Sequence, residues 1–189
     1  MTFYENGLIR AMKSAFRKDG YTVAATESGY IVLGENWGVS IHSKAMPNTV
    51  KSLIVLHAGK LPEENKAIQV KKGEILSCFY EMAVDRIDDL DTHYRKALRS
   101  RIFPTRLIMD GCRLWQLTDS LTIKRVDPEN EQILDYMDND AYLVRGMLYG
   151  TTVYGSVFVA CENAVEEDKG LMAHLEQMQW IPIEVCDAG

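Results

Sequence analysis

The spacing of apolar side chains predicts an amphipathic helix near the start of the chain, in residues 4–20. Leu8, Met12 and Phe16 recur at helical spacing and therefore share one face. The opposite face carries three basic side chains: Arg10, Lys13 and Arg17. The pattern ends at a glycine, which is common just after a helix. We therefore expect a helix that buries one face and presents a basic one.

Short apolar runs follow this helix and predict a series of strands. Clusters of glycine, asparagine and proline separate the runs, as is typical of turns between strands. The predicted strands of this part of the chain are residues 21–26, 30–35, 38–43, 52–57 and 67–70.

The longest helical pattern opens after Gly73 and covers residues 74–100. Apolar side chains keep a single stripe along it: Leu76, Phe79, Ala83, Ile87, Leu90, Tyr94 and Leu98. Glu74 lies in the first turn and basic residues lie in the last turns, which complements the helix dipole at both ends. Pro104 limits the helix, because proline cannot donate a backbone hydrogen bond. We therefore predict one long central helix.

Strand patterns resume after this helix. The predicted strands are residues 105–110, 112–117, 121–126, 142–150 and 152–160. A turn is predicted at residues 127–132, while the overlapping segment 129–137 suits either a strand or a short helix. A last helix at residues 169–178 and an edge strand at residues 180–186 complete the pattern.

Runs of strands separated by single helices predict an α+β fold with a mostly antiparallel β-sheet packed against one long central helix. Shorter helices are expected towards both ends of a single domain, residues 1–189. A weak similarity of pattern between residues 29–56 and 105–134 raises the hypothesis of two similar lobes. The lobes would be residues 1–72 and 104–189, joined by the helix 74–100. The pattern leaves the strand order open.

Composition and charge narrow the class of protein. The chain has 189 residues, of which 47% are hydrophobic and 25% are charged, as in an ordinary folded domain. Its net charge is −6, which disfavours a protein that binds nucleic acid by neutralising phosphates. The longest uncharged run, residues 146–161, is too short for a membrane helix and contains glycines.

The cysteines predict a reducing compartment. Cys78, Cys112, Cys161 and Cys186 are widely spaced, without a C-x-x-C pair. The first twenty residues also carry charges where an export signal would need an apolar core. We therefore expect reduced cysteines and a cytoplasmic protein.

The segment "EMAVDRIDDLDTH", residues 81–93, is the densest group of ionisable side chains in the chain. On a helical wheel its carboxylates at Glu81, Asp85 and Asp89 lie opposite the apolar stripe. Solvated carboxylates keep ordinary pKa values and bind metals weakly, so we interpret them as a surface for a partner. Their expected counterpart is the basic face of the first helix, met either across a dimer or within one chain.

Two other groups of residues suggest chemistry. His42, His57 and Cys78 would line a cleft if the strands predicted around the two histidines paired, which suits a small-ligand binder or an enzyme with a nucleophilic thiol. Asp89 and His93 are one helical turn apart and could together hold a divalent ion, although the sequence nominates no further ligand.

Taken together, these patterns predict a non-enzymatic, cytoplasmic interaction or scaffold protein that self-associates. The expected contact residues are Glu81, Asp85, Asp89, Arg10, Lys13 and Arg17. No cofactor or metal is expected, because the sequence has no phosphate-binding glycine loop and no metal-binding histidine or cysteine motif. The alternatives are the cleft described above and weak nucleic-acid binding through the basic strip of residues 93–106.

Overall fold

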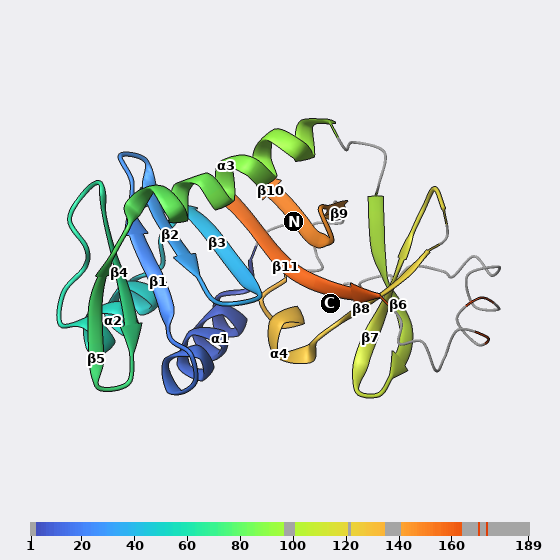
Figure 1. Cartoon of the computed structure of the whole chain (residues 1–189), viewed down its shortest axis with the longest axis horizontal. Coiled ribbons are helices and arrows are strands. Elements are labelled where there is room, and N and C mark those ends of the chain that lie inside the picture. The colour runs from blue at the N-terminus through green and yellow to red at the C-terminus, as the bar shows by residue number, and fades with distance from the viewer. Residues whose placement is uncertain are drawn as a thin grey trace, which may run out of the picture.

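The computed structural model describes residues 3–96, 101–120, 122–134, 141–163, 170 and 173. These residues form an α+β fold around a large antiparallel sheet of eleven strands, with helices on both faces (Figure 1). The predicted fold class is thus confirmed, whereas the single long central helix and the two similar lobes are not.

The elements alternate between strand hairpins and helices along the chain. The helices are α1 (Glu5–Arg17), the 3-10 turn η1 (Ser43–Ala45), α2 (Asn48–Ala58), α3 (Tyr80–Lys96) and α4 (Pro128–Glu131). The strands before α3 are β1 (Tyr21–Ala25), β2 (Gly29–Leu33), β3 (Trp37–His42), β4 (Lys66–Lys71) and β5 (Glu74–Cys78). The strands after α3 are β6 (Arg101–Met109), β7 (Cys112–Leu117), β8 (Ile123–Val126), β9 (Ala141–Val144), β10 (Met147–Thr152) and β11 (Gly155–Asn163).

The predicted strand at residues 52–57 is wrong, because this segment belongs to helix α2. Val50, Leu53 and Ile54 are buried at helical spacing, while Leu56 points into solvent. A short apolar run without a polar face cannot be assigned to helix or strand from its pattern alone.

The predicted helix 74–100 is correct from Tyr80 to Lys96, and residues 97–100 lie outside the described part of the chain. Residues 74–78 form β5, which pairs with β4 through a tight turn at Lys72 and Gly73. Gly73 has a φ of +82°, a backbone conformation that favours glycine. Ala83, Ile87 and Leu90 are buried in line with the pattern. The stripe extends into β5 because residues 75–79 happen to continue the apolar spacing.

Two predictions fall wholly or partly outside the described residues. The ambiguous segment 129–137 begins in the short helix α4, while residues 135–140 are not described. Of the predicted helix 169–178, only Gly170 and Ala173 are described, and the edge strand 180–186 lies outside the described residues.

The strand order contains the same arrangement twice. The full order is β10-β9-β6-β7-β8-β11-β3-β2-β1-β4-β5, with β10 also paired to β11. Two runs of five strands share one arrangement: β3-β2-β1-β4-β5 and β8-β7-β6-β9-β10. If the strands of each run are numbered 1 to 5 along the chain, both runs have the spatial order 3-2-1-4-5. We call the first run the open arm. The second run closes into a ring with β11, which we call the closed ring.

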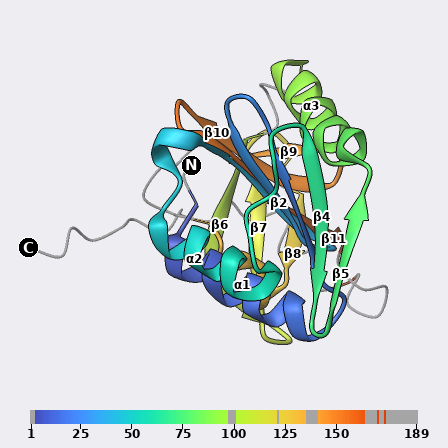
Figure 2. The ribbon, with the colours of Figure 1, turned by 90° about the vertical axis from the view of Figure 1, so that its left-hand side faces the viewer.

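Two apolar clusters cover the two faces of the open arm. Successive residues of a strand point to opposite faces, so Tyr21 and Val23 face α1 and α2, whereas Ala24 faces α3. Figure 2 shows α1 and α2 on one side of the sheet and α3 on the other. Among the described helices, none is long and apolar enough to cross a membrane.

Candidate functional site

Large apolar side chains are exposed at the end of the open arm, on β5 and at the start of α3. Their exposed fractions are 53% for Ile75, 47% for Leu76, 75% for Phe79 and 69% for Met82. We call these four residues the edge patch. Among the described strands, β5 pairs only with β4, so its other edge faces outward (Figure 2). Exposed apolar patches of this kind mark sites of association.

Two hollows flank the edge patch, one on each face of the arm. The hollow on the α3 face has a volume of about 630 Å³ and is lined by Thr22, Leu33, Cys78 and Met82 among others. The hollow on the other side has a volume of about 590 Å³, and Ile75 contributes to its wall. Phe79 lines both hollows and therefore separates them. The free edge of β5 thus has room for side chains on both faces of the sheet.

Charged side chains lie at the two ends of β5 and not at its centre. Lys71 at the end of β4, Lys72 in the turn and Glu74 at the first position of β5 are exposed, and Glu81 is exposed just after the strand. Between them, Ile75, Leu76 and Ser77 are uncharged and exposed. The first end of this edge therefore has a net positive charge, although it carries one carboxylate, and the other end is acidic.

The thiol of Cys78 lies on the α3 face of the arm, where it packs with the cluster that contains Ala83 and Leu90. Burial raises the pKa of the Cys78 thiol above its ordinary value, and a side-chain hydrogen bond with Thr22 offsets part of this rise. A raised pKa lowers the fraction of reactive thiolate at neutral pH.

The two histidines do not join Cys78. His57 lies in α2, where its ring stacks on Phe16 at a centroid distance of 3.8 Å, and its Nδ1 is 2.9 Å from the hydroxyl oxygen of Tyr21. Tyr21 and Thr22 are consecutive on β1, so His57 and Cys78 lie on opposite faces of the sheet. His42 ends β3 and is exposed, and its Nδ1 accepts a hydrogen bond from the amide of Lys44.

The acidic face of α3 points away from the sheet, as the helical wheel predicts. Glu81 and Asp85 are exposed, whereas Asp89 is partly buried and engaged within the chain. An Oδ2 of Asp89 lies 2.7 Å from Nη1 of Arg145, in the turn between β9 and β10, and Oδ1 lies 3.3 Å from Nδ1 of His93. Among the described residues, no group of three acidic, histidine or cysteine side chains is arranged to hold a metal ion.

The basic residues of α1 are also exposed, on its outer face. Arg10, Lys13 and Arg17 point away from the cluster formed by Leu8 and Met12. Because α1 and α3 cover opposite faces of the sheet, the basic and acidic faces cannot meet within one chain. The prediction of a contact within one chain is therefore excluded, while a contact between copies stays a prediction.

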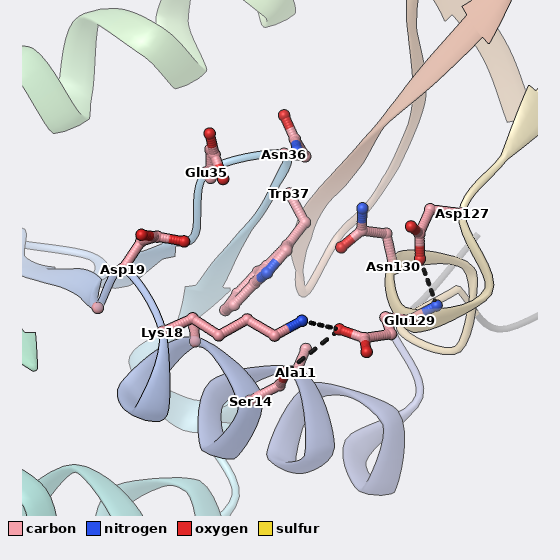
Figure 3. Close-up of a pocket in the computed structure, with 12 residues that line it drawn as sticks. Ala11, Ser14, Lys18, Asp19, Glu35, Asn36, Trp37, Asp127, Glu129 and Asn130 are labelled. Atoms are coloured by element: carbon pink, nitrogen blue, oxygen red, sulfur yellow. Dashed lines mark hydrogen bonds and ion pairs between the residues drawn. The ribbon is translucent and has the colours of Figure 1, made fainter. Parts of the chain in front are cut away.

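A small polar hollow of about 140 Å³ lies where α1, the turn between β2 and β3, and α4 meet (Figure 3). Nζ of Lys18 is 2.9 Å from Oε2 of Glu129, to which the hydroxyl of Ser14 also donates at 3.2 Å. This pairing raises the pKa of Lys18 and lowers that of Glu129. Asp127 accepts a hydrogen bond from the amide of Glu129 and caps α4. The contacts of Lys18 and Ser14 with Glu129 at this hollow therefore join α1 to α4.

The basic strip at residues 93–106 is only partly described. Residues 97–100 lie outside the described part of the chain, and Arg101 and Arg106 are exposed on β6. The side chain of His93 bonds to the backbone oxygen of Asp89 at 2.7 Å. The side chains of residues 94–96 are not described either, so nucleic-acid contact through this strip stays a prediction.

Sequence reasoning missed the edge patch. The helical pattern places Leu76 and Phe79 in a buried stripe, yet both are exposed. The signal for the correct structure is the pair Lys72 and Gly73 between two β-like runs, since a glycine in a two-residue loop is typical of a hairpin.

Comparisons of this chain with models of known protein families, with curated proteins and with solved structures give no match. The geometry of the edge patch and the charges around it are therefore the basis for inferring a function.

Proposed function

We propose that this chain is a non-enzymatic, cytoplasmic interaction protein that self-associates through the edge patch. The observation that carries the proposal is the clustering of Ile75, Leu76, Phe79 and Met82 on and beside a strand whose outer edge is open in the described structure. Burying one such side chain is worth about 1.5–3 kcal/mol relative to leaving it in water. Burial of the four side chains therefore contributes favourably to association, against its cost in translational and rotational freedom.

Exposed charges on the two helices offer a second contact between copies, separate from the edge patch. Glu81 and Asp85 on α3 and the basic residues of α1 are exposed on outward faces of opposite sign. A contact between these faces needs a second copy, because the two helices lie on opposite sides of the sheet. We assign this contact a smaller contribution, since exposed ion pairs contribute only about 0.2–1 kcal/mol each. Asp89 contributes less than the other acids because it is already paired with Arg145.

Sedimentation of the full chain over a range of concentrations tests the proposal. The variant Phe79→Ser removes the most exposed side chain of the edge patch. We expect it to weaken association at least about tenfold, since 1.4 kcal/mol corresponds to a factor of ten. The matched control is Val153→Ser, at a side chain that is 86% exposed in the turn between β10 and β11. A wild-type chain that stays monomeric, or equal effects of the two variants, would refute the proposal.

The alternative of an enzyme with a reactive thiol makes a separate prediction. It requires Cys78 to react faster with an alkylating reagent than Cys161, whose pKa is raised to about 11 by burial. The raised pKa of Cys78 itself and its separation from His57 favour slow labelling of both thiols. Mass spectrometry of the labelled peptides measures the two rates, and preferential labelling of Cys78 would favour the enzyme.

A further inference from the structure

The strand pairing identifies the edge through which the self-association proposed above occurs. The two five-stranded runs have four outer strands, which are β3, β5, β8 and β10. Strand β11 pairs with three of them, which are β3, β8 and β10. Within the described residues, β5 is therefore the outer strand that lacks a second neighbour.

The centre of β5 lacks the features that protect edge strands from pairing. Native edges are commonly blocked by a proline, a bulge or a charge near the middle of the strand. The pairing of β5 with β4 is regular from Glu74 to Cys78, and the central residues are Ile75, Leu76 and Ser77. The central backbone of this short edge is therefore not blocked by a charge, a proline or a bulge.

The net charges at the two ends of β5 favour a second copy in the antiparallel direction. Lys71 ends β4, Lys72 lies in the turn and Glu74 begins β5, which leaves this end with one net positive charge, while Glu81 lies just beyond the other end. When two copies of this strand run antiparallel, the start of each lies beside the end of the other, so that ends of opposite net charge meet twice. A parallel arrangement would place lysine beside lysine and glutamate beside glutamate, which is unfavourable.

We propose that two copies of the chain pair through β5 in antiparallel orientation, about a two-fold axis perpendicular to the sheet, so that the two open arms form one continuous sheet. Addition of a strand to a free edge is an established mode of recognition, and a two-fold axis makes the contact self-complementary. In this pair, Lys72 and Glu74 of one copy lie near Glu81 of the other. The axis leaves α3 of both copies on one face of the joined sheet and α1 of both on the other, so a contact between their charged faces would join different pairs.

The apolar side chains define the register of this pairing. With the axis at Ser77, Ile75 of one copy lies opposite Phe79 of the other, and Leu76 lies opposite Cys78. Directly opposed residues of antiparallel strands point to the same face, so each of these pairs is in contact. The hollow of about 590 Å³ beside Ile75 then receives Phe79 of the second copy on the face away from α3.

The path of α3 leaves this edge accessible. The helix follows β5 directly but contacts β4, β1, β2 and β9, so that it runs from the edge towards the closed ring (Figure 1). The turn before β5 is fixed as well, because the amide of Lys72 donates to the backbone oxygen of Phe16 at 2.9 Å. The edge is thus presented in a fixed position for a second copy.

A disulfide cross-link tests the register directly. In the full-length variant Ser77→Cys, the thiols at position 77 of two copies face each other across the axis. Opposed Cα atoms of antiparallel strands are about 4.5–5.5 Å apart, which suits a disulfide. We expect mild oxidation to give a covalent dimer whose linked peptides both contain position 77. The control Val153→Cys places a thiol at an exposed turn of the closed ring, and we expect at least about tenfold slower cross-linking there.

A charge exchange tests the direction of the strands. Lys72→Glu and Glu81→Lys should each weaken the dimer about two- to fivefold, and the double variant should recover most of the loss. Lys44→Glu, at an exposed lysine of η1, makes the same change of net charge and should have a smaller effect. Self-association that depends on Phe79 but shows neither a link at position 77 nor recovery in the double variant would overturn the strand pairing and leave the proposed function intact. A chain that stays monomeric would overturn both.

Discussion

Strands β5 and β10 hold the same place in their two runs, but their environments are opposite. Strand β10 lies between β9 and β11, and its Leu148 and Tyr149 are fully buried. Strand β5 has β4 on one side only, and its Ile75 and Leu76 are about half exposed. The difference arises from the next segment of the chain, because a tight turn returns the chain as β11 after β10, whereas Phe79 leads into α3 after β5.

This comparison explains why one end of the sheet suits association. In the closed ring, the chain itself supplies the neighbour of the fifth strand. In the open arm, the next segment is a helix that covers a face of the sheet and leaves the edge unpaired within the described residues. A second copy would supply at β5 the neighbour that β11 supplies at β10.

The largest expected loss of stability comes from replacing Phe158, a core residue of β11. Phe158 is fully buried, and the guanidinium of Arg86 from α3 lies 5.0 Å from its ring centre. Phe158→Ala should lower the free energy of unfolding by about 3–5 kcal/mol, because it leaves a cavity. Phe79→Ala, at the exposed edge, should change the stability of the monomer by no more than about 0.5 kcal/mol. Urea denaturation at low protein concentration measures both, and similar losses would contradict the comparison.

Replacing Gly73, just before β5, and Gly155, the first residue of β11, should give the next largest difference in the free energy of unfolding. Gly155 has a φ of +144°, and a Cβ there would lie 1.9 Å from the backbone oxygen of Ser40 on β3. Gly155→Ala must therefore displace β11 from β3 as well as strain the backbone, and we expect a loss well above about 2 kcal/mol. Gly73→Ala meets no neighbouring atom, so only the backbone cost of about 1–2 kcal/mol applies. Thermal unfolding of the two variants measures the difference, which should be absent if β11 does not hold the two runs together.

Local patterns predict much of the fold, because several elements have both a periodic apolar face and clear end signals. The first helix is an example, with Leu8 and Met12 buried and the basic residues outside. Helix α2 has the pattern of a strand because its exposed Val55 and Leu56 remove the polar face that would mark a helix.

The strand order and the edge patch require information that no local pattern contains. Phe158 lies opposite Gly38, far away in the sequence, and this pairing joins the open arm to the closed ring. The exposure of Leu76 is not predictable from the sequence of β5 alone, because burial depends on which strands are neighbours. The exposed acids Glu81 and Asp85 are predictable, since they depend only on the face of one helix.

A smaller loss of stability is expected when the ion pair between α3 and the closed ring is removed. The carboxylate of Asp89 pairs with Arg145 at 2.7 Å, and both side chains are about half exposed. Asp89→Asn should lower the free energy of unfolding by about 0.2–1 kcal/mol, less so in high salt. Asp85→Asn, one turn earlier on the exposed face, is the matched control. Urea denaturation at low and high ionic strength distinguishes the two, and equal effects would show that the ion pair does not stabilise the junction.

The smallest effect is a pH dependence that arises from His57, on the face of the open arm covered by α2. Burial and the nearby charge of Lys13 lower the pKa of His57 from its ordinary value of 6.5. The folded chain therefore binds a proton at this ring less readily than the unfolded chain does. The neutral ring stabilises the fold above pH 6.5, and this contribution is lost as the pH falls below 6.5 towards the lowered value.

The variant His57→Gln tests this contribution, because glutamine keeps a polar group near Tyr21 without titrating in this range. We expect unfolding free energies measured from about pH 7.5 to about pH 5 to decline less in this variant than in the wild type. His42→Gln, at an exposed histidine outside the stack with Phe16, is the matched control. If the two variants follow the same pH profile, the stacked ring of His57 does not link protonation to the stability of the open arm.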